Sequence, residues 1–567
     1  MKDGFLKAAA AAPKIRVADP AWNALEICKA LDSCYAQRAK LIVLPELCLT
    51  GYTCQDLFLQ ERLLEESLEG LQTVLEHTKG HDALTFVGLP FEKDGKLYNV
   101  AAALQDGRIL GLVPKQNIPN YGEFYEVRHF AAGSREVSEV DVLGQTVPFG
   151  GNLLFSCRNL KGLVVGCELC EDVWVMDPPS TALAKAGATV IVNLSASNET
   201  VGKDTYRKSL IAATSARLLC GYVYASAGDG ESTQDLVFSG HHMIAENGSV
   251  LAEAARFENE TIFSELDIHK ICHERRRMST FVPENTETCV RIGFTLEKEE
   301  TKLTRTFAQM PFVPSDETLK KERCEQILSI QAQGLKKRYE HTGAKTAVIG
   351  VSGGLDSTLA LLVTARAFDL LGKDRNDILA VTMPCFGTTN RTYENACRLA
   401  QTLGAKLIEV NIREAVQVHF RDIGQDMDKH DVTYENGQAR ERTQVLMDLA
   451  NQSNGLVIGT GDMSELALGW ATYNGDHMSM YGVNVGVPKT LVRHLVAYCA
   501  NTCSESEKVL QEVLLDVLDT PVSPELLPPE DGKISQKTED LVGPYELHDF
   551  FLYQLLRCGF GPAKIYR

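Results

Sequence analysis

The sequence predicts an α/β protein of two domains, and three observations lead to this prediction. The chain has 567 residues, which is more than one ordinary hydrophobic core accommodates. Short apolar runs alternate with stretches of helical periodicity in both halves, which is typical of sheets covered by helices. Between the halves, residues 296–320 are first charged and then punctuated by prolines, which indicates a linker. We therefore expect domains at 1–295 and 321–567.

The composition narrows the class of ligand. A formal net charge of −18 attracts neither nucleic acid nor an anionic membrane, so we expect small-molecule substrates. No apolar run approaches the roughly 18 residues that span a bilayer. The 16 cysteines are spread through the chain without a compact framework, which favours reduced thiols and a cytoplasmic location.

The first half has the pattern of a sheet-rich α/β unit. Asp106-Gly107 and Asn247-Gly248 are typical of tight turns between antiparallel strands. The apolar runs that predict strands lie at 5–12, 40–44, 84–89, 100–104, 163–166, 189–194 and 221–225.

Three strand ends in this half carry polar residues that an apolar sheet does not need. Glu46 follows the run at 40–44, Lys115 closes the run at 110–114, and Cys170 follows the run that begins at 163. Taken singly, a strand-end Glu or Lys is most often solvated. Together they supply a proton acceptor, a cation and a nucleophile, which is the set that thiol attack on an amide carbon requires.

Cys167 and Cys170 also form a C-x-x-C pair, which has two other interpretations. A zinc site needs a second pair of ligands, and none with suitable spacing lies nearby. A redox dithiol is expected at a helix N-terminus, whereas Cys167 lies within the predicted strand.

Leu-Pro-Glu46, Pro-Lys115 and Cys170-Glu171-Asp172, in this chain order, resemble the triad of the nitrilase superfamily of carbon–nitrogen hydrolases. The resemblance implies an αββα sandwich, with Cys170 as nucleophile, Glu46 as acid and base, and Lys115 as oxyanion stabiliser. It implies that Glu123 supports the triad. It further implies a glutamine pocket lined by Tyr121, Phe124, Glu171, Ser197 and Lys203.

The second half predicts a parallel sheet. A helix is expected at 317–341, after which strands at 345–351, 378–383, 406–411 and 456–459 alternate with helices at 357–371, 390–403 and 440–453. In such a sheet the ligands lie beyond the carboxyl ends of the strands.

A glycine loop, Ser352-Gly-Gly-Leu-Asp356-Ser357, joins the first of these strands to its helix. Glycine accepts a positive φ, so the loop turns backbone N–H groups toward one point, where the helix N-terminus also favours an anion such as phosphate. It differs from the mononucleotide P-loop because Asp356 stands where that loop has lysine. Asp356, and Glu465 beyond the strand at 456–459, are ligand types suited to Mg²⁺.

The strings SGGLDST, NGQARER, GTGDMSELALGW and GVPKTLV resemble those of NAD⁺ synthetases, whose loop is of the ATP-pyrophosphatase type. With the nitrilase-like half in front, the chain resembles the glutamine-dependent members. The resemblance implies that ATP binds to Ser352, Gly353, Gly354, Leu355, Asp356, Ser357 and Thr460. It implies that Asp356 and Glu465 hold Mg²⁺, and that deamido-NAD⁺ binds to Asn436, Arg440, Glu465, Trp470 and Lys489.

The implied reaction amidates AMP-activated deamido-NAD⁺ with ammonia freed from glutamine, in a homo-oligomer with an enclosed path for the ammonia. The resemblance also implies a basic C-terminal tail that completes the synthetase site, and the chain ends at Arg567 before such a tail. The alternative is a nitrilase-type amidohydrolase whose second half only senses nucleotide.

Overall fold

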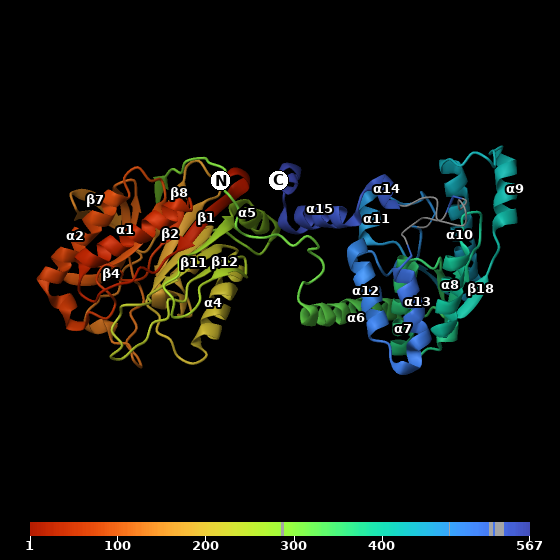
Figure 1. The fold of residues 1–567 in the computed structure, drawn as a ribbon, viewed down its shortest axis with the longest axis horizontal. Coiled ribbons are helices and arrows are strands. Elements are labelled where there is room, and N and C mark those ends of the chain that lie inside the picture. The colour runs from red at the N-terminus through yellow and green to blue at the C-terminus, as the bar shows by residue number, and fades with distance from the viewer. Residues whose placement is uncertain (285–287, 476, 521–525, 528–537) are drawn as a thin grey trace. The chain divides into compact units, whose positions relative to one another are not determined.

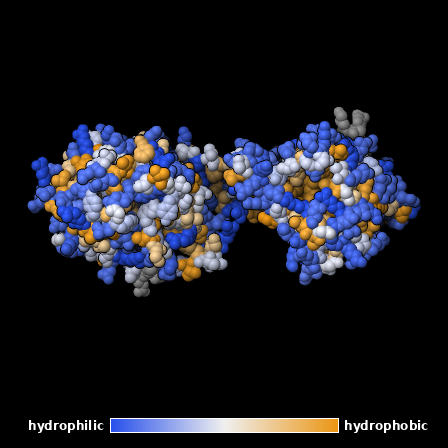
Figure 2. Space-filling view, turned by 90° about the horizontal axis from the view of Figure 1, so that it is seen from below, coloured by the Kyte–Doolittle hydropathy of each residue, from blue (hydrophilic) through white to orange (hydrophobic). Residues whose placement is uncertain are grey.

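The computed structural model describes residues 1–284, 288–475, 477–520, 526–527 and 538–567. It divides into two units, Met1–Thr306 and Phe307–Arg567, so the division falls within the expected linker (Figure 1). Figure 2 shows one face of the chain, where hydrophilic side chains predominate and hydrophobic ones are scattered. Within the described ranges no helix has the length and apolar character needed to cross a bilayer.

The described residues of unit 1 form two sheets and five α-helices. The first sheet has the strand order β14-β1-β2-β3-β4-β5-β7-β6. Its strands are β1 (Phe5–Ala10), β2 (Leu41–Val43), β3 (Leu84–Lys93), β4 (Lys96–Gln105), β5 (Arg108–Pro114), β6 (Ser138–Val142), β7 (Gln145–Phe149) and β14 (Ile262–Asp267).

The second sheet has the order β13-β12-β11-β10-β9-β8-β15. Its strands are β8 (Leu153–Cys157), β9 (Val164–Leu169), β10 (Val190–Ser195), β11 (Gly221–Ser226), β12 (Met243–Glu246), β13 (Ser249–Glu253) and β15 (Val290–Phe294). The helices of unit 1 are α1 (Pro20–Ala36), α2 (Glu61–His77), α3 (Pro179–Lys185), α4 (Lys203–Leu218) and α5 (Ile268–Arg277).

The side chains of these strands alternate between two buried faces, which stacks the unit in four layers. Val43 of β2 lies in the core between the sheets, which also contains Val192 of β10. Ile42 points the other way, into a core shared with Ile27 of α1. Ile191 of β10 lies in a third core with buried residues of α3 and α4. Because successive strand side chains point to opposite faces, this arrangement confirms the predicted αββα sandwich.

The two predicted hairpins are present. Asp106-Gly107 joins β4 to β5 and Asn247-Gly248 joins β12 to β13, each pair of strands being antiparallel. All four turn residues have positive φ, as a two-residue turn of this type requires.

Unit 2 is built on a five-stranded parallel sheet with the order β18-β17-β16-β19-β20. Its strands are β16 (Ala347–Gly350), β17 (Ile378–Thr382), β18 (Lys406–Glu409), β19 (Leu456–Gly459) and β20 (Tyr481–Gly482). Its helices are α6 (Glu317–Thr342), α7 (Leu355–Leu371), α8 (Asn390–Thr402), α9 (Arg413–Ile423), α10 (Val432–Ser453), α11 (Met463–Leu468), α12 (Lys489–Asn501), α13 (Lys508–Leu518), α14 (Thr538–Val542), α15 (Tyr545–Cys558) and α16 (Pro562–Tyr566).

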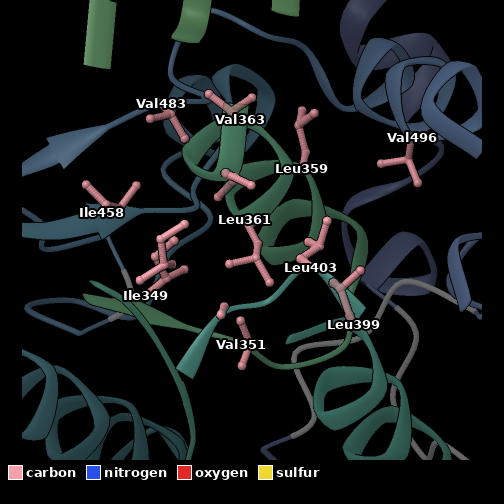
Figure 3. Close-up of a cluster of buried hydrophobic side chains, with 14 of the residues drawn as sticks. Ile349, Val351, Leu359, Leu361, Val363, Leu399, Leu403, Ile458, Val483 and Val496 are labelled. Atoms are coloured by element: carbon pink, nitrogen blue, oxygen red, sulfur yellow. The ribbon is translucent and has the colours of Figure 1, made fainter. Parts of the chain in front are cut away.

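Helices cover both faces of this sheet. Ile349 of β16 packs with Leu359 of α7 and Val496 of α12 in one core (Figure 3). Val348, the neighbouring residue, points to the opposite core together with Phe420 of α9. The expected parallel sheet between helical layers is therefore confirmed.

The helix expected at 440–453 begins earlier than predicted. Asp431 caps α10 by accepting hydrogen bonds from the N–H groups of Thr433 and Tyr434. The helix consequently includes Asn436, which the predicted range leaves outside, and Arg440 lies within it instead of at its start.

The strand order creates a switch point in unit 2. From the central strand β16 the chain runs to β17 and β18 at one edge, and β19 and β20 lie on the other side of β16. The loops that follow β16 and β19 thus lead away from each other at the carboxyl ends of adjacent strands, where open α/β sheets bind ligands.

Candidate active sites

A lysine held between two carboxylates forms the centre of the site in unit 1. Lys115 directly follows β5, and its Nζ donates hydrogen bonds to Glu46 Oε1 at 2.7 Å and to both carboxylate oxygens of Glu126 at 2.8 Å. Lys115 and Glu46 are fully buried, and Glu126 is 6% exposed. Asn99 Nδ2 and the Ala196 N–H also donate to Glu46, at 2.6 and 2.8 Å. Every charge in this cluster therefore has a partner, as burial requires.

The electrostatics keep this lysine charged. Burial alone lowers the pKa of Lys115, but the carboxylates of Glu126 and Glu46 outweigh burial and raise that pKa well above its ordinary value. Burial raises the pKa of Glu126, against the opposing effect of Lys115. With both carboxylates ionised, the cluster carries one net negative charge.

Cys170 is the first residue after β9 and adopts a φ of 41°, which non-glycine residues rarely adopt. Strained positions of this kind cluster at functional sites. Burial, and then the charge of Glu46, raises the pKa of the Cys170 thiol, while Lys115 acts against them. The thiol is therefore protonated at neutral pH, so nucleophilic attack requires a base that removes its proton.

The residues predicted to bind glutamine lie around one cavity of about 390 Å³ that Cys170 also lines. The Tyr121 hydroxyl donates to Glu171 Oε1 at 2.8 Å. Lys203 Nζ lies 5.5 Å from the ring centre of Phe124, and it donates a hydrogen bond to Asn198. The five residues brought together there are Tyr121, Phe124, Glu171, Ser197 and Lys203. Their role in glutamine binding stays a prediction.

The acidic residue that supports Lys115 differs from the expected one. Glu123 accepts a hydrogen bond from Asn198 Nδ2 at 2.6 Å, whereas Glu126 contacts Lys115 and accepts a hydrogen bond from the Tyr52 hydroxyl at 2.7 Å. Glu126 is the first residue of a short 3-10 turn and is buried, whereas Glu123 is exposed.

The C-x-x-C pair does not form a paired site. Cys167 lies in the core between the two sheets, whereas Cys170 lines the cavity. Both are free thiols.

In unit 2 the glycine loop follows β16 at the switch point. Gly353 has a φ of 82°, and a Cβ there would lie 2.1 Å from the Thr392 carbonyl oxygen, so only glycine fits. The loop is closed by hydrogen bonds from the Gly354 N–H to Ser352 Oγ and from the Ser357 hydroxyl to the Gly354 carbonyl.

A cavity of about 270 Å³ opens at this point. All the predicted ATP-binding residues except Gly353 line it, namely Ser352, Gly354, Leu355, Asp356, Ser357 and Thr460, and Glu465 lines it as well. Arg442, one of the two arginines in the NGQARER string, is a further lining residue, and Arg440 is not among the lining residues.

Lys489 lies among three carboxylates beside this cavity. Its Nζ is 2.7 Å from Asp356 Oδ2, 2.7 Å from Asp462 Oδ2 and 2.8 Å from Glu465 Oε1. Burial, and then Asp356, raises the pKa of Asp462 to about 6 and that of Glu465 to about 8. Burial alone lowers the pKa of Lys489, but these carboxylates raise it well above its ordinary value.

The same carboxylates fit a divalent cation. One oxygen from each of Asp356, Asp462 and Glu465 lies within 4.8 Å of the others. Asp356 Oδ1 is buried and accepts no hydrogen bond within the described part of the chain. Hard carboxylate oxygens are the ligands that Mg²⁺ prefers, so the donor set suits that ion. Asp462 is the member that sequence reasoning missed.

The other residues predicted to bind deamido-NAD⁺ are not among those that line the cavity. Asn436 is half-buried on α10, Arg440 is exposed and donates to the Tyr473 carbonyl at 3.1 Å, and Trp470 is 37% exposed. Of that set, only Glu465 and Lys489 lie together.

The two folds and their sites define a class of protein in which a carbon–nitrogen hydrolase unit precedes a nucleotide-binding synthase unit. Residues 7–275 match the family model for carbon-nitrogen hydrolases, and residues 327–554 match the model for NAD synthase. The chain belongs to the glutamine-dependent NAD(+) synthetase family, because curated members of that family are 42% identical to it over 99% of its length.

Relatives named as glutamine-dependent NAD(+) synthetases match over nearly the whole chain. Those of Mycobacterium bovis and Mycobacterium leprae are each 42% identical, covering 99% of this chain and 85% of the relative. That of Aquifex aeolicus is 29% identical, covering 97% of this chain and 89% of the relative.

Proposed function

We propose that this protein makes NAD⁺ from deamido-NAD⁺, using ATP to activate the acid and glutamine to supply the nitrogen. One observation carries the proposal: the chain combines a thiol beside a buried lysine–carboxylate cluster in unit 1 with a glycine loop at a sheet switch point in unit 2. The 42% identity to relatives named for this activity supports the same conclusion.

The chemistry of unit 1 follows from its charges. Glu46 removes the proton of the Cys170 thiol, and the sulfur bonds to the amide carbon of glutamine. Lys115 stabilises the oxyanion that forms. Glu46 then gives its proton to the nitrogen as the carbon–nitrogen bond breaks, so ammonia leaves and a thioester remains. Water, deprotonated by Glu46, hydrolyses the thioester to glutamate and restores the thiol.

The chemistry of unit 2 is acyl activation followed by amide formation. The nicotinate carboxylate of deamido-NAD⁺ attacks the α-phosphorus of ATP, and the bond to pyrophosphate breaks. Ammonia then attacks the activated carbonyl carbon, and AMP leaves. The glycine loop from Ser352 to Ser357 would cradle the phosphates with its backbone N–H groups, and its place at the cavity supports that role.

Mg²⁺ is part of the proposal. Asp356, Asp462 and Glu465 would hold the ion, and their separation supports this. When bound, the ion offsets phosphate charge and polarises the bond to pyrophosphate. Lys489 neutralises part of the charge of the same three carboxylates.

The test compares two nitrogen donors. Cys170→Ala should form no NAD⁺ with glutamine but should keep the wild-type rate with ammonium chloride. Cys167→Ala is the matched control, because Cys167 is fully buried on β9 and lies in the core between the sheets. This control should use both donors. NAD⁺ is measured by chromatography in the presence of ATP, Mg²⁺ and deamido-NAD⁺.

Two outcomes would overturn the proposal. If the wild-type protein forms no NAD⁺ from either donor while it releases ammonia from glutamine, unit 2 is a nucleotide sensor and the protein is an amidohydrolase. If folded Cys170→Ala still uses glutamine, Cys170 is not the nucleophile.

A further inference from the structure

A chain of buried polar side chains lies behind Cys170, on the helix-covered face of the second sheet. Glu168 of β9, Asn193 of β10 and Tyr222 of β11 belong to it, and all three are fully buried. Their strand neighbours Cys167, Leu169, Val192 and Leu194 lie in the core between the sheets. Because strand side chains alternate, the polar chain lies on the opposite face, where Tyr222 packs with residues of α3 and α4.

The hydrogen bonds of this chain run in one direction, from the nucleophile's backbone to a carboxylate. The Cys170 N–H donates to Asn193 Oδ1 at 3.2 Å, and Asn193 Nδ2 donates to the Tyr222 hydroxyl at 3.1 Å. The Tyr222 hydroxyl donates to Glu168 Oε1 at 2.5 Å, and the Ser180 N–H donates to Glu168 Oε2 at 2.8 Å. An N–H can only donate, so the Asn193 amide has one possible orientation.

Glu168 sets this direction because an ionised carboxylate only accepts. Burial raises the pKa of Glu168 to about 7, while the hydrogen bonds from Tyr222 and Ser180 favour its ionised form. A neutral amide at this position would face both donors with only one accepting atom.

The chain meets Cys170 where its backbone is strained. Cys170 has a φ of 41°, and such a conformation persists only where surrounding contacts impose it. The hydrogen bond from its N–H to Asn193 is a contact of this kind, because it ties the residue to the neighbouring strand.

The end of β10, the strand of Asn193, also contacts Glu46, the proposed base. Two residues after Asn193, the Ser195 carbonyl accepts a hydrogen bond from the Glu46 N–H at 3.3 Å, and the Ala196 N–H donates to Glu46 Oε2 at 2.8 Å. The Ser195 hydroxyl donates to Asn193 Oδ1 at 2.7 Å. The end of β10 therefore fixes the nucleophile and the base relative to each other.

We propose that Glu168, Tyr222 and Asn193 are positioning residues that hold the backbone of Cys170 in place for attack on glutamine. The inference rests on the proposed glutaminase reaction of unit 1. None of the three lines the cavity of Cys170, so they act through that residue and not on the substrate.

Two substitutions test the chain at its ends. Asn193→Leu keeps the approximate volume and removes the acceptor for the Cys170 N–H. Glu168→Gln keeps the shape, but its amide can accept from only one of the two donors. A nucleophile displaced by about 1 Å can lose about 100-fold in rate, so we expect kcat for glutamine hydrolysis to fall about 100-fold in the first variant and about 10-fold in the second. KM should stay within about twofold.

Two further readouts separate positioning from general damage. Iodoacetamide should alkylate Cys170 more slowly in both variants, as followed by mass spectrometry of the peptide that contains it. Ammonia-driven NAD⁺ formation should be unchanged, because it depends on unit 2. Glu246→Gln is the matched control: Glu246 is a fully buried carboxylate of β12 that pairs with Lys270 and Arg305, and this variant should retain kcat and alkylation rate.

Two results would overturn the positioning role of Glu168, Tyr222 and Asn193. One is wild-type kcat and alkylation rates in folded Asn193→Leu and Glu168→Gln. The other is an equal loss of kcat in Glu246→Gln. Failure of the proposed function is distinguishable, because in that case the wild-type protein and Cys170→Ala would not differ in glutamine hydrolysis.

Discussion

Replacing Lys115 with methionine removes the cation between two buried carboxylates. At an effective dielectric constant of about 20, each of its contacts at 2.7 and 2.8 Å contributes about 6 kcal/mol before desolvation is counted. After desolvation, removing one partner of such a pair costs about 3–5 kcal/mol. We expect the free energy of unfolding of unit 1 to fall by that amount. Because an oxyanion donor is also lost, kcat for glutamine hydrolysis should fall about 10²- to 10³-fold.

The loss of unfolding free energy in Lys115→Met should depend on pH in a defined direction. Without Lys115, Glu126 stays buried beside the charge of Glu46 and loses the cation that opposes both effects, so the pKa of Glu126 in the folded protein rises further above the unfolded value of about 4.3. The folded state then binds more protons than the unfolded state, and its stability decreases as the pH rises through the folded pKa. Lys115→Met should therefore be least stable, relative to wild type, near pH 8, and should recover toward pH 5.

Hydrogen exchange of peptides from β4 and β5 measures this local stability, and glutamate release measures kcat. Lys7→Met is the matched control, because Lys7 and Glu265 form a buried pair at 3.1 Å in the same unit. It should lose stability and keep kcat within about twofold, since a remote change leaves the oxyanion donor in place. A Lys115→Met protein with wild-type kcat, or with a larger deficit at pH 5 than at pH 8, would refute the reasoning.

Three further changes test the two cavities. Gly353→Ala should abolish NAD⁺ formation from either nitrogen donor, because the new Cβ would lie 2.1 Å from a carbonyl oxygen. Gly372→Ala is the control, because Gly372 has a φ of 64° but open space around it. This control should lower the free energy of unfolding by about 1–2 kcal/mol and keep activity. Asp462→Asn should weaken activation by Mg²⁺ about 10- to 100-fold in a metal titration, and an unchanged titration would remove Asp462 from the metal set. Lys203→Met should raise KM for glutamine about 10-fold through the loss of a charged hydrogen-bond donor, and a higher KM for ammonia instead would contradict its place in the Cys170 cavity.

The fold was largely predictable because of where its strands lie. Strands covered on both faces read as continuous apolar runs, as at 40–44 and 189–194, and the structure has β2 and β10 there. The start of α10 was not predictable from hydrophobic periodicity, because its first turns contain Asn436 and Gly437, which are poor helix formers. There the capping carboxylate of Asp431 determines the boundary.

The strand-end residues of unit 1 were predictable as types, but their supporting contacts were not. Glu46 and Cys170 follow strands of different sheets, and they approach each other because the sheets pack face to face. Glu126 was missed because the choice between it and Glu123 depends on a 3-10 turn. Asp462 was missed because its place in the sequence is typical of a helix N-cap. The structure shows that it does cap α11, since its Oδ1 accepts a hydrogen bond from the Glu465 N–H at 2.9 Å.

Both sites contain a buried lysine that pairs with carboxylates, but the net charge of the two clusters differs. In unit 1, Lys115 faces two carboxylates and leaves one net negative charge, which a single proton neutralises. That is the charge needed to accept the thiol proton of Cys170. In unit 2, Lys489 faces three carboxylates and leaves two net negative charges when all are ionised, which a divalent cation balances. The number of carboxylates around each lysine thus agrees with the two proposed roles, proton transfer in unit 1 and Mg²⁺ binding in unit 2.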